Sequence, residues 1–180
     1  GVKLVKRANE QLQKELGEPT YAPDGNGIYY VRNISPGNTF EYAQDSRTNL
    51  FNIERYDIDT GEVTTAASGA GGAVRPTPSP DGKRMAFVRR DRGESTLWVK
   101  DFATGAERKI YDALDRDMQE TWAVTGVYPN MSWTPDGSAI VFWAGGKIRR
   151  VGANGGEASV IPFSISDTRV VKSSAASVPR

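Results

Sequence analysis

Three aspartates recur at the same place in a repeated phrase, and they are the first residues to consider for chemistry. Asp24, Asp81 and Asp136 each stand between a proline and a glycine, in "YAPDGNGIYYV", "PSPDGKRMAFV" and "WTPDGSAIVFW". Paired carboxylates can hydrolyse glycosides, but only when they lie a short distance apart. Because each aspartate belongs to a separate repeat, we expect them to lie far from one another and interpret them as turn residues. We predict no catalytic residue in this chain.

A second acidic group lies in the phrase "DRDMQE". Asp115, Asp117 and Glu120 could provide the carboxylate oxygens that calcium prefers. The phrase lacks the glycine and the ligand spacing of an EF-hand loop, so we interpret it as a solvated or ion-paired loop. The sequence therefore predicts no metal site.

The chain contains no histidine and no cysteine. These absences exclude disulfides, thiol nucleophiles, zinc sites with cysteine or histidine ligands, and nucleophilic mechanisms that use histidine as the base. The glycine-rich segment 67–75, "ASGAGGAVR", lacks the Lys-Ser or Lys-Thr of a phosphate-binding loop and leads into a strand. We interpret it as a crossing between repeats, and we predict no bound cofactor.

The charge of the chain gives no general reason to expect an anionic partner. Lysine and arginine number 23 against 22 acidic residues, for a net charge of +1. Acidic residues are interleaved with the basic ones, so we predict no nucleic-acid partner. No stretch approaches the roughly 18 consecutive apolar residues of a membrane-spanning helix, so we predict no membrane span. The residues that could otherwise bind and stack on nucleic acid are Arg89, Arg90, Arg92, Arg149 and Arg150, with Trp98 and Trp143.

The four tryptophans could line a ligand channel. Trp98, Trp133 and Trp143 occupy predicted strands, where packing between repeats needs bulky side chains, so we expect them in the core. Trp122 is the exception, because it lies in an inserted segment.

The elements that position these residues repeat along the chain. Pro23, Pro80 and Pro135 are spaced by 57 and 55 residues, which is the range of repeat architectures. In each unit a short extended piece precedes the turn, and three predicted strands follow it, with a glycine turn before the last. Each unit is thus a four-stranded antiparallel meander, which describes a β-propeller blade. Insertions at 34–49 and 112–127 lengthen the period.

We therefore predict an all-β fold, a partial β-propeller of about three four-stranded antiparallel blades plus an outer strand of a preceding blade. The predicted segments are 1–17 as that outer strand with a helical link, 18–66 as a blade, 67–111 as a blade, 112–163 as an inserted link with a blade, and 164–180 as a tail leading to a missing segment.

Three blades do not close a ring, because known propellers have about four to eight. The chain also begins at glycine rather than methionine, so we expect a processed product or a fragment. Uncovered blade faces would leave apolar side chains in water. We predict that the rest of the parent chain or another protein covers them, or that copies associate through these faces.

The repeated pattern P-x-x-x-PDG, followed by an L/I-W/R-V strand and a D-x-x-T/G-G turn, resembles the TolB-type (PD-type, WD-like) propeller repeat over about residues 18–163. The phrases "LWVKDFATGAERKI" and "WTPDGSAIVFWAGGKIRRV" are also similar to the propeller preceding the catalytic barrel of bacterial amidohydrolase-like proteins.

The second resemblance implies a noncatalytic propeller segment that serves protein–protein or interdomain packing within a metal-dependent hydrolase. The alternative is a TolB-like envelope propeller that binds proteins and has no enzyme domain. Either resemblance favours a periplasmic or secreted location.

Overall fold

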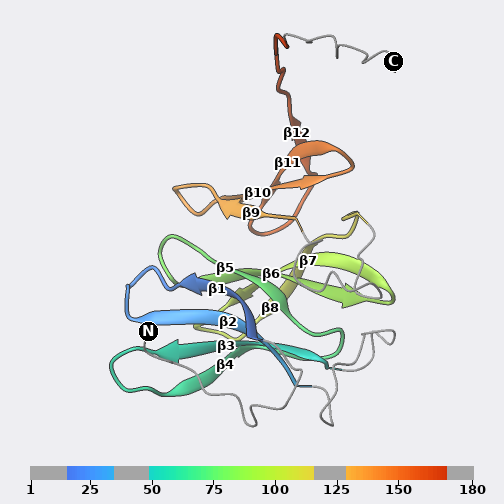
Figure 1. Cartoon of the computed structure of the whole chain (residues 1–180). Coiled ribbons are helices and arrows are strands. Elements are labelled where there is room, and N and C mark those ends of the chain that lie inside the picture. The colour runs from blue at the N-terminus through green and yellow to red at the C-terminus, as the bar shows by residue number, and fades with distance from the viewer. Residues whose placement is uncertain (1–15, 35–48, 116–128, 170–180) are drawn as a thin grey trace, which may run out of the picture.

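The computed structural model describes residues 16–34, 49–115 and 129–169 (Figure 1). None of these residues lies in a helix long and apolar enough to cross a membrane. The strands within these ranges are β1 (Leu16–Tyr21), β2 (Gly27–Asn33), β3 (Phe51–Asp57), β4 (Val63–Ala67), β5 (Val74–Pro78), β6 (Arg84–Asp91), β7 (Glu94–Asp101), β8 (Glu107–Tyr111), β9 (Met131–Trp133), β10 (Ala139–Ala144), β11 (Lys147–Gly152) and β12 (Ser159–Ile161).

The strands form three separate four-stranded sheets, each in chain order. Blade 1 is β1-β2-β3-β4, blade 2 is β5-β6-β7-β8 and blade 3 is β9-β10-β11-β12. Every neighbouring pair is antiparallel. In Figure 1 the blades follow one another from bottom to top. The predicted fold class, an all-β fold of propeller blades, is confirmed.

The turn between the first two strands of each blade is built by the repeated proline, aspartate and glycine. Its glycine has a φ of 75° at Gly25, 70° at Gly82 and 66° at Gly137, a conformation that costs a larger residue energy. The aspartate accepts a hydrogen bond from the backbone amide two residues further on, which holds the turn closed. These bonds are Asn26 N to Asp24 Oδ1 (2.9 Å), Lys83 N to Asp81 Oδ1 (3.1 Å) and Ser138 N to Asp136 Oδ1 (3.0 Å).

The second strand of a blade is buried on both sides, whereas the fourth is largely exposed. In β6, six consecutive residues from Met85 to Arg90 are buried, while in β8 only Ile110 is buried. A strand packed on both faces needs a continuous apolar run, as in 85–88, and an outer strand tolerates charge. The apolar or charged character of each strand therefore follows its position in the sheet, with the second strand buried and the fourth exposed.

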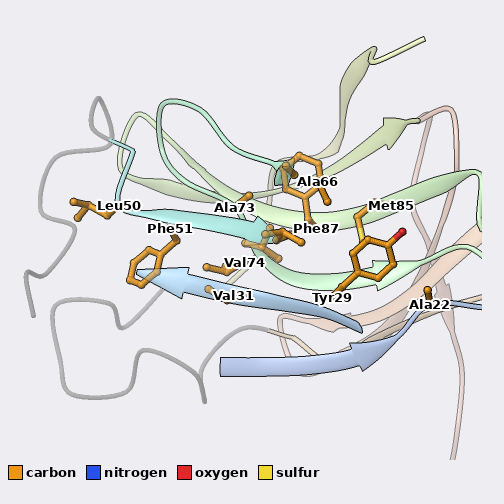
Figure 2. Packing of buried hydrophobic residues seen from close by; sticks show 13 residues of the cluster. Ala22, Tyr29, Val31, Leu50, Phe51, Ala66, Ala73, Val74, Met85 and Phe87 are labelled. Carbon is orange, nitrogen blue, oxygen red and sulfur yellow. The ribbon is translucent and has the colours of Figure 1, made fainter. Parts of the chain in front are cut away.

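Two apolar cores join the three blades. The core between blades 1 and 2 is shown in Figure 2, where Tyr29 of blade 1 lies beside Met85 of blade 2. The core between blades 2 and 3 places Leu97 and Ile110 against Ile140, Phe142 and Val151. The blades are therefore joined by side-chain packing and a few specific bonds rather than by strand pairing.

Several predictions fall outside the described residues. They are residues 1–15 of the outer strand and helical link predicted over 1–17, most of the insertion at 34–49, Asp117, Glu120 and Trp122 in the insertion at 112–127, and residues 170–180 of the predicted tail.

Candidate functional site

The first strands of the three blades line a groove of about 500 Å³. β1, β5 and β9 each lie at the edge of their sheet. Prolines suit such edges because they have no amide N–H to offer a further strand, and they protect the edge from unwanted pairing. The groove therefore presents proline rings together with Tyr21 and Trp133. The prolines that line it are Pro19, Pro23, Pro76, Pro78 and Pro80.

The carboxylate of Glu18 in blade 1 is bonded to Arg75 in blade 2 at this groove. The backbone N–H of Arg75 donates to Glu18 Oε2 at 2.6 Å, and Arg75 Nε lies 3.4 Å from Glu18 Oε1. The Glu18 side chain is only 7% exposed. Burial raises the pKa of its carboxyl above the ordinary value, and the amide and the charge of Arg75 oppose that rise. The pair fixes β1 against β5.

Both residues of this pair have an unusual backbone. Glu18 has a φ of 53° and Arg75 a φ of 59°, a region that non-glycine residues rarely occupy. Each lies in a bulge of its strand, between Gly17 and Thr20 or between Val74 and Thr77. Such a conformation is maintained when the surroundings impose it, and here the bond between the two blades does so. Asn130, which lines the groove too, stands at the same place in the third repeat.

At the groove, blade 3 is bonded to blade 2 through other groups. The indole Nε1 of Trp133 donates to the Thr77 carbonyl at 2.8 Å. The guanidinium of Arg84 lies 4.9 Å from the centroid of the Trp133 ring and donates to the Gly137 carbonyl at 2.7 Å. Hydrogen bonding and a cation–π contact thus replace the ionic pair.

A smaller hollow of about 280 Å³ adjoins the groove at Pro23 and Pro80. It is lined by both Asp24 and Asp81, so the expectation that the three turn aspartates lie far from one another is wrong for this pair. The Ser79 hydroxyl donates to Asp81 Oδ1 at 2.5 Å. That bond and the Lys83 amide hold the pKa of the Asp81 carboxyl below its usual range. Asp81 is therefore ionised at neutral pH and is unsuited to act as a general acid.

The groove is better suited to binding than to catalysis. Glu18 is the one carboxylate among its described lining residues, and Arg75 occupies it. General acid–base chemistry with two carboxylates needs a second one nearby. What remains is a mixed surface of proline and aromatic rings with polar side chains such as Thr20, Thr77 and Asn130, and Tyr21 on it is 70% exposed. Such a surface suits a protein segment.

The basic residues considered for nucleic acid do not form one exposed group. Arg89 and Arg90 are buried. Arg89 donates to Glu107 Oε2 at 2.7 Å and to the carbonyls of Gly72 and Ser68, and it lies over the rings of Phe87 and Trp98. It therefore ties the crossing between blades 1 and 2 to the outer strand β8.

The predictions for the tryptophans and for the acidic phrase "DRDMQE" have different outcomes. Trp133 is buried, but Trp143 is 40% exposed, so its prediction as a core residue is wrong in this structure. The reason is that no described sheet packs on its side of blade 3. Asp115 accepts the Gly145 amide at 2.9 and 3.2 Å, and no three potential metal ligands cluster among the described residues.

Sequence reasoning missed the pairing of Glu18 with Arg75. A signal was present, because both residues stand five positions before the proline of a PDG turn and both precede Pro-Thr. Aligning the repeats at that position would have singled them out.

Comparison with known proteins places the chain among propellers. It matches no protein-family model. It is 30% identical over 125 residues to the uncharacterized peptidase YuxL of Bacillus subtilis, covering 69% of this chain and 16% of the peptidase. It is 28% identical over 145 residues to the Tol-Pal system protein TolB of Alcanivorax borkumensis, covering 71% of this chain and 31% of TolB.

The solved structures agree on the fold. TolB from Acinetobacter baumannii aligns with a TM-score of 0.60 and 24% identity, over 83% of this chain and 33% of that one. The predicted TolB-like propeller is confirmed. The chain spans about a third or less of the length of these relatives, and they give no support to the amidohydrolase-like parent.

Proposed function

We propose that this chain is part of a noncatalytic, TolB-like β-propeller that binds another protein through the groove lined by β1, β5 and β9. The observation that carries the proposal is the groove itself, which joins proline-rich edges and exposed Tyr21 while its buried carboxylate, Glu18, is taken up by Arg75. The similarity to the Tol-Pal system protein TolB supports the TolB-like part of the proposal.

The chemistry of the groove favours docking by side chains. Proline has no N–H, so the edge strands β1, β5 and β9 offer few hydrogen-bond donors to an added β-strand. Aromatic residues with one polar atom, such as Tyr21 with its hydroxyl, contribute strongly to protein interfaces. A partner would therefore place apolar side chains among the prolines and bond to Tyr21.

The test uses the complete protein and the other components of the Tol-Pal system of its own organism as probes. Binding is measured by calorimetry for the wild type, for Tyr21→Ala and for Val63→Ala. Val63 is a matched control, because it is an exposed apolar residue of blade 1 on the outer strand β4, away from the groove. We expect Tyr21→Ala to weaken binding about tenfold or more, and Val63→Ala to leave it unchanged. Equal binding by all three proteins, or no binding by any, contradicts the proposal.

A second candidate is a propeller that packs against a peptidase domain supplied by the rest of a longer chain. The 30% identity to YuxL over 69% of this chain favours it. Hydrolysis of chromogenic peptide substrates by the complete protein, surviving repurification, would support this candidate.

The amidohydrolase-like parent predicted from loop phrases makes a different demand. It requires amide hydrolysis that is lost when a chelator removes the metal and restored when the metal is returned. Peptidase activity that is unaffected by chelation would decide against it.

A further inference from the structure

Met131 of β9 lies where the two apolar cores meet. Its side chain packs against the core between blades 1 and 2 and also against the core between blades 2 and 3, and Leu114 shares this double contact. Met131 is half-buried and lines the groove as well. A change in the polarity of this one side chain therefore acts on both interfaces between blades and can be made from the groove.

The other two blades have proline at this place. Pro19 and Pro76 stand four positions before the proline of a PDG turn, as Met131 does. All three residues line the groove. Proline resists oxidation by peroxide, whereas a methionine thioether is converted to a sulfoxide. Of the three described blades, blade 3 alone therefore has an oxidisable side chain at this position.

The other methionine among the described residues is enclosed. Met85 in β6 is 0% exposed, whereas Met131 borders the groove. Because exposure controls this oxidation, an oxidant in solution should reach Met131 well before Met85. The chain has no cysteine, so no thiol in it competes for the oxidant.

We propose that Met131 is a reversible oxidation site at which a peroxide weakens the attachment of blade 3 to blades 1 and 2. The electron pair of the sulfur takes up one oxygen of the peroxide, and the O–O bond breaks. The other oxygen takes the proton of the transferred hydroxyl and leaves as water, so the sulfur is oxidised and the peroxide is reduced. A methionine sulfoxide reductase, using electrons from a dithiol, restores the thioether.

The sulfoxide replaces a soft apolar group with a polar one inside apolar surroundings. Met131 is the register partner of Phe142, whose ring is 2% exposed and meets the Tyr111 ring edge to face at 4.8 Å. A polar group without a hydrogen-bond partner in such surroundings costs stability. Strand β9 should therefore separate from blade 2 more readily, and the bond from the Trp133 indole to the Thr77 carbonyl should weaken with it.

The inference goes beyond the proposed function, because the oxidation of Met131 and the stability of the fold are measured without a binding partner. Oxidation should also weaken binding in the groove, since Met131 lines it, and this further effect rests on the proposed function. The failure of Tyr21→Ala to weaken binding would count against the proposed function and leave the oxidation site as it stands.

The test treats the complete protein with dilute hydrogen peroxide and follows each methionine by peptide mass spectrometry. We expect Met131 to be oxidised several-fold faster than Met85, the enclosed reference. In urea, oxidation should raise the unfolding equilibrium constant about five- to thirtyfold, and treatment with the reductase should restore the original value. Oxidation of Met85 at the same rate as Met131 overturns the inference.

Two variants separate this site from the other methionines of the complete protein. Met131→Leu keeps an apolar side chain of similar volume and has no sulfur, so peroxide should not alter its unfolding relative to its own untreated sample. Met85→Leu should respond to peroxide as the wild type does. An undiminished response in Met131→Leu contradicts the proposal, and so does wild-type protein that unfolds identically with and without the Met131 sulfoxide.

Discussion

The two interfaces between blades both contain an apolar core, but the bonds and ring contacts across them differ. Between blades 1 and 2, the buried carboxylate of Glu18 accepts a hydrogen bond from the Arg75 amide at 2.6 Å. Between blades 2 and 3, at the same groove, the Trp133 indole donates to the Thr77 carbonyl at 2.8 Å. The aromatic contacts differ as well. Tyr29 and Phe102 stack at 6.1 Å, whereas Tyr111 and Phe142 meet edge to face at 4.8 Å.

This difference shows that the repeat determines where blades touch and leaves open which atoms make the contact. A sheet face must be covered by apolar side chains, and many combinations of them satisfy that need. The bonds at the groove are more particular, since a buried carboxylate and a buried indole each need a specific partner. One interface consequently contains a buried carboxylate and the other a buried indole.

The largest expected effect comes from the apolar cores, which we expect to be equivalent in the two interfaces. Phe87→Ala removes a fully buried ring between blades 1 and 2, and Phe142→Ala removes a ring 2% exposed between blades 2 and 3. Each should lower the free energy of unfolding by about 3–5 kcal/mol. Urea denaturation followed by fluorescence and circular dichroism measures both. A loss below about 1 kcal/mol for one ring alone would break the equivalence of the interfaces.

The next effect lies in the crossing between blades 1 and 2. Gly71 has a φ of 82°, and a Cβ there would lie 1.8 Å from the Arg90 carbonyl oxygen. Gly82, with a φ of 70° and nothing within 4 Å of its Cβ position, is the matched control. Gly82→Ala should cost about 1–2 kcal/mol for the left-handed backbone. Gly71→Ala should cost clearly more, because the backbone of β6 must move. Equal losses of unfolding free energy for the two variants, measured by thermal or urea unfolding, would mean that a Cβ at position 71 does not displace the backbone of β6.

A smaller effect separates the two groove bonds. Glu18→Ala leaves the Arg75 amide without its acceptor and should lower the free energy of unfolding by about 1–3 kcal/mol. Trp133→Phe keeps an aromatic ring beside Arg84 but loses the indole bond, so it should cost about 1 kcal/mol. The double variant should show additive losses, because the two bonds lie at different interfaces. Strong coupling between them would show that the interfaces are not independent.

The smallest effect is in the pH dependence. Because burial raises the pKa of Glu18, its contribution to stability is greatest below the ordinary pKa of 4.5 and is lost as the pH rises through the folded value. Glu18→Gln should therefore gain stability relative to the wild type as the pH increases from that range to neutrality. Trp133→Phe should show no such trend.

The measurement is urea unfolding at a series of pH values above 4. The lowered pKa values of Asp81 and Asp136, the latter about 2, act in the opposite direction below that range. A constant difference between Glu18→Gln and the wild type would contradict the role given to burial.

The fold was predictable because its signals are local. The proline and glycine of the PDG turn impose their backbone within a few residues, and strand alternation extends over six or eight. The pair of Glu18 and Arg75 was missed since its members are 57 residues apart and meet only when two blades stack. Trp143 shows a further limit. It occupies the same strand position as Val88, but its burial depends on a neighbour that the described chain does not provide.

The central claim is that three separate four-stranded blades stack through their faces. Nuclear Overhauser spectroscopy of the isotopically labelled chain tests it most directly, because antiparallel neighbours bring backbone protons together. We expect strand-to-strand backbone contacts within β1 to β4, within β5 to β8 and within β9 to β12. Between blades we expect side-chain contacts such as Tyr29 with Phe102. Backbone contacts pairing β4 with β5 or β8 with β9 in one continuous sheet would contradict it.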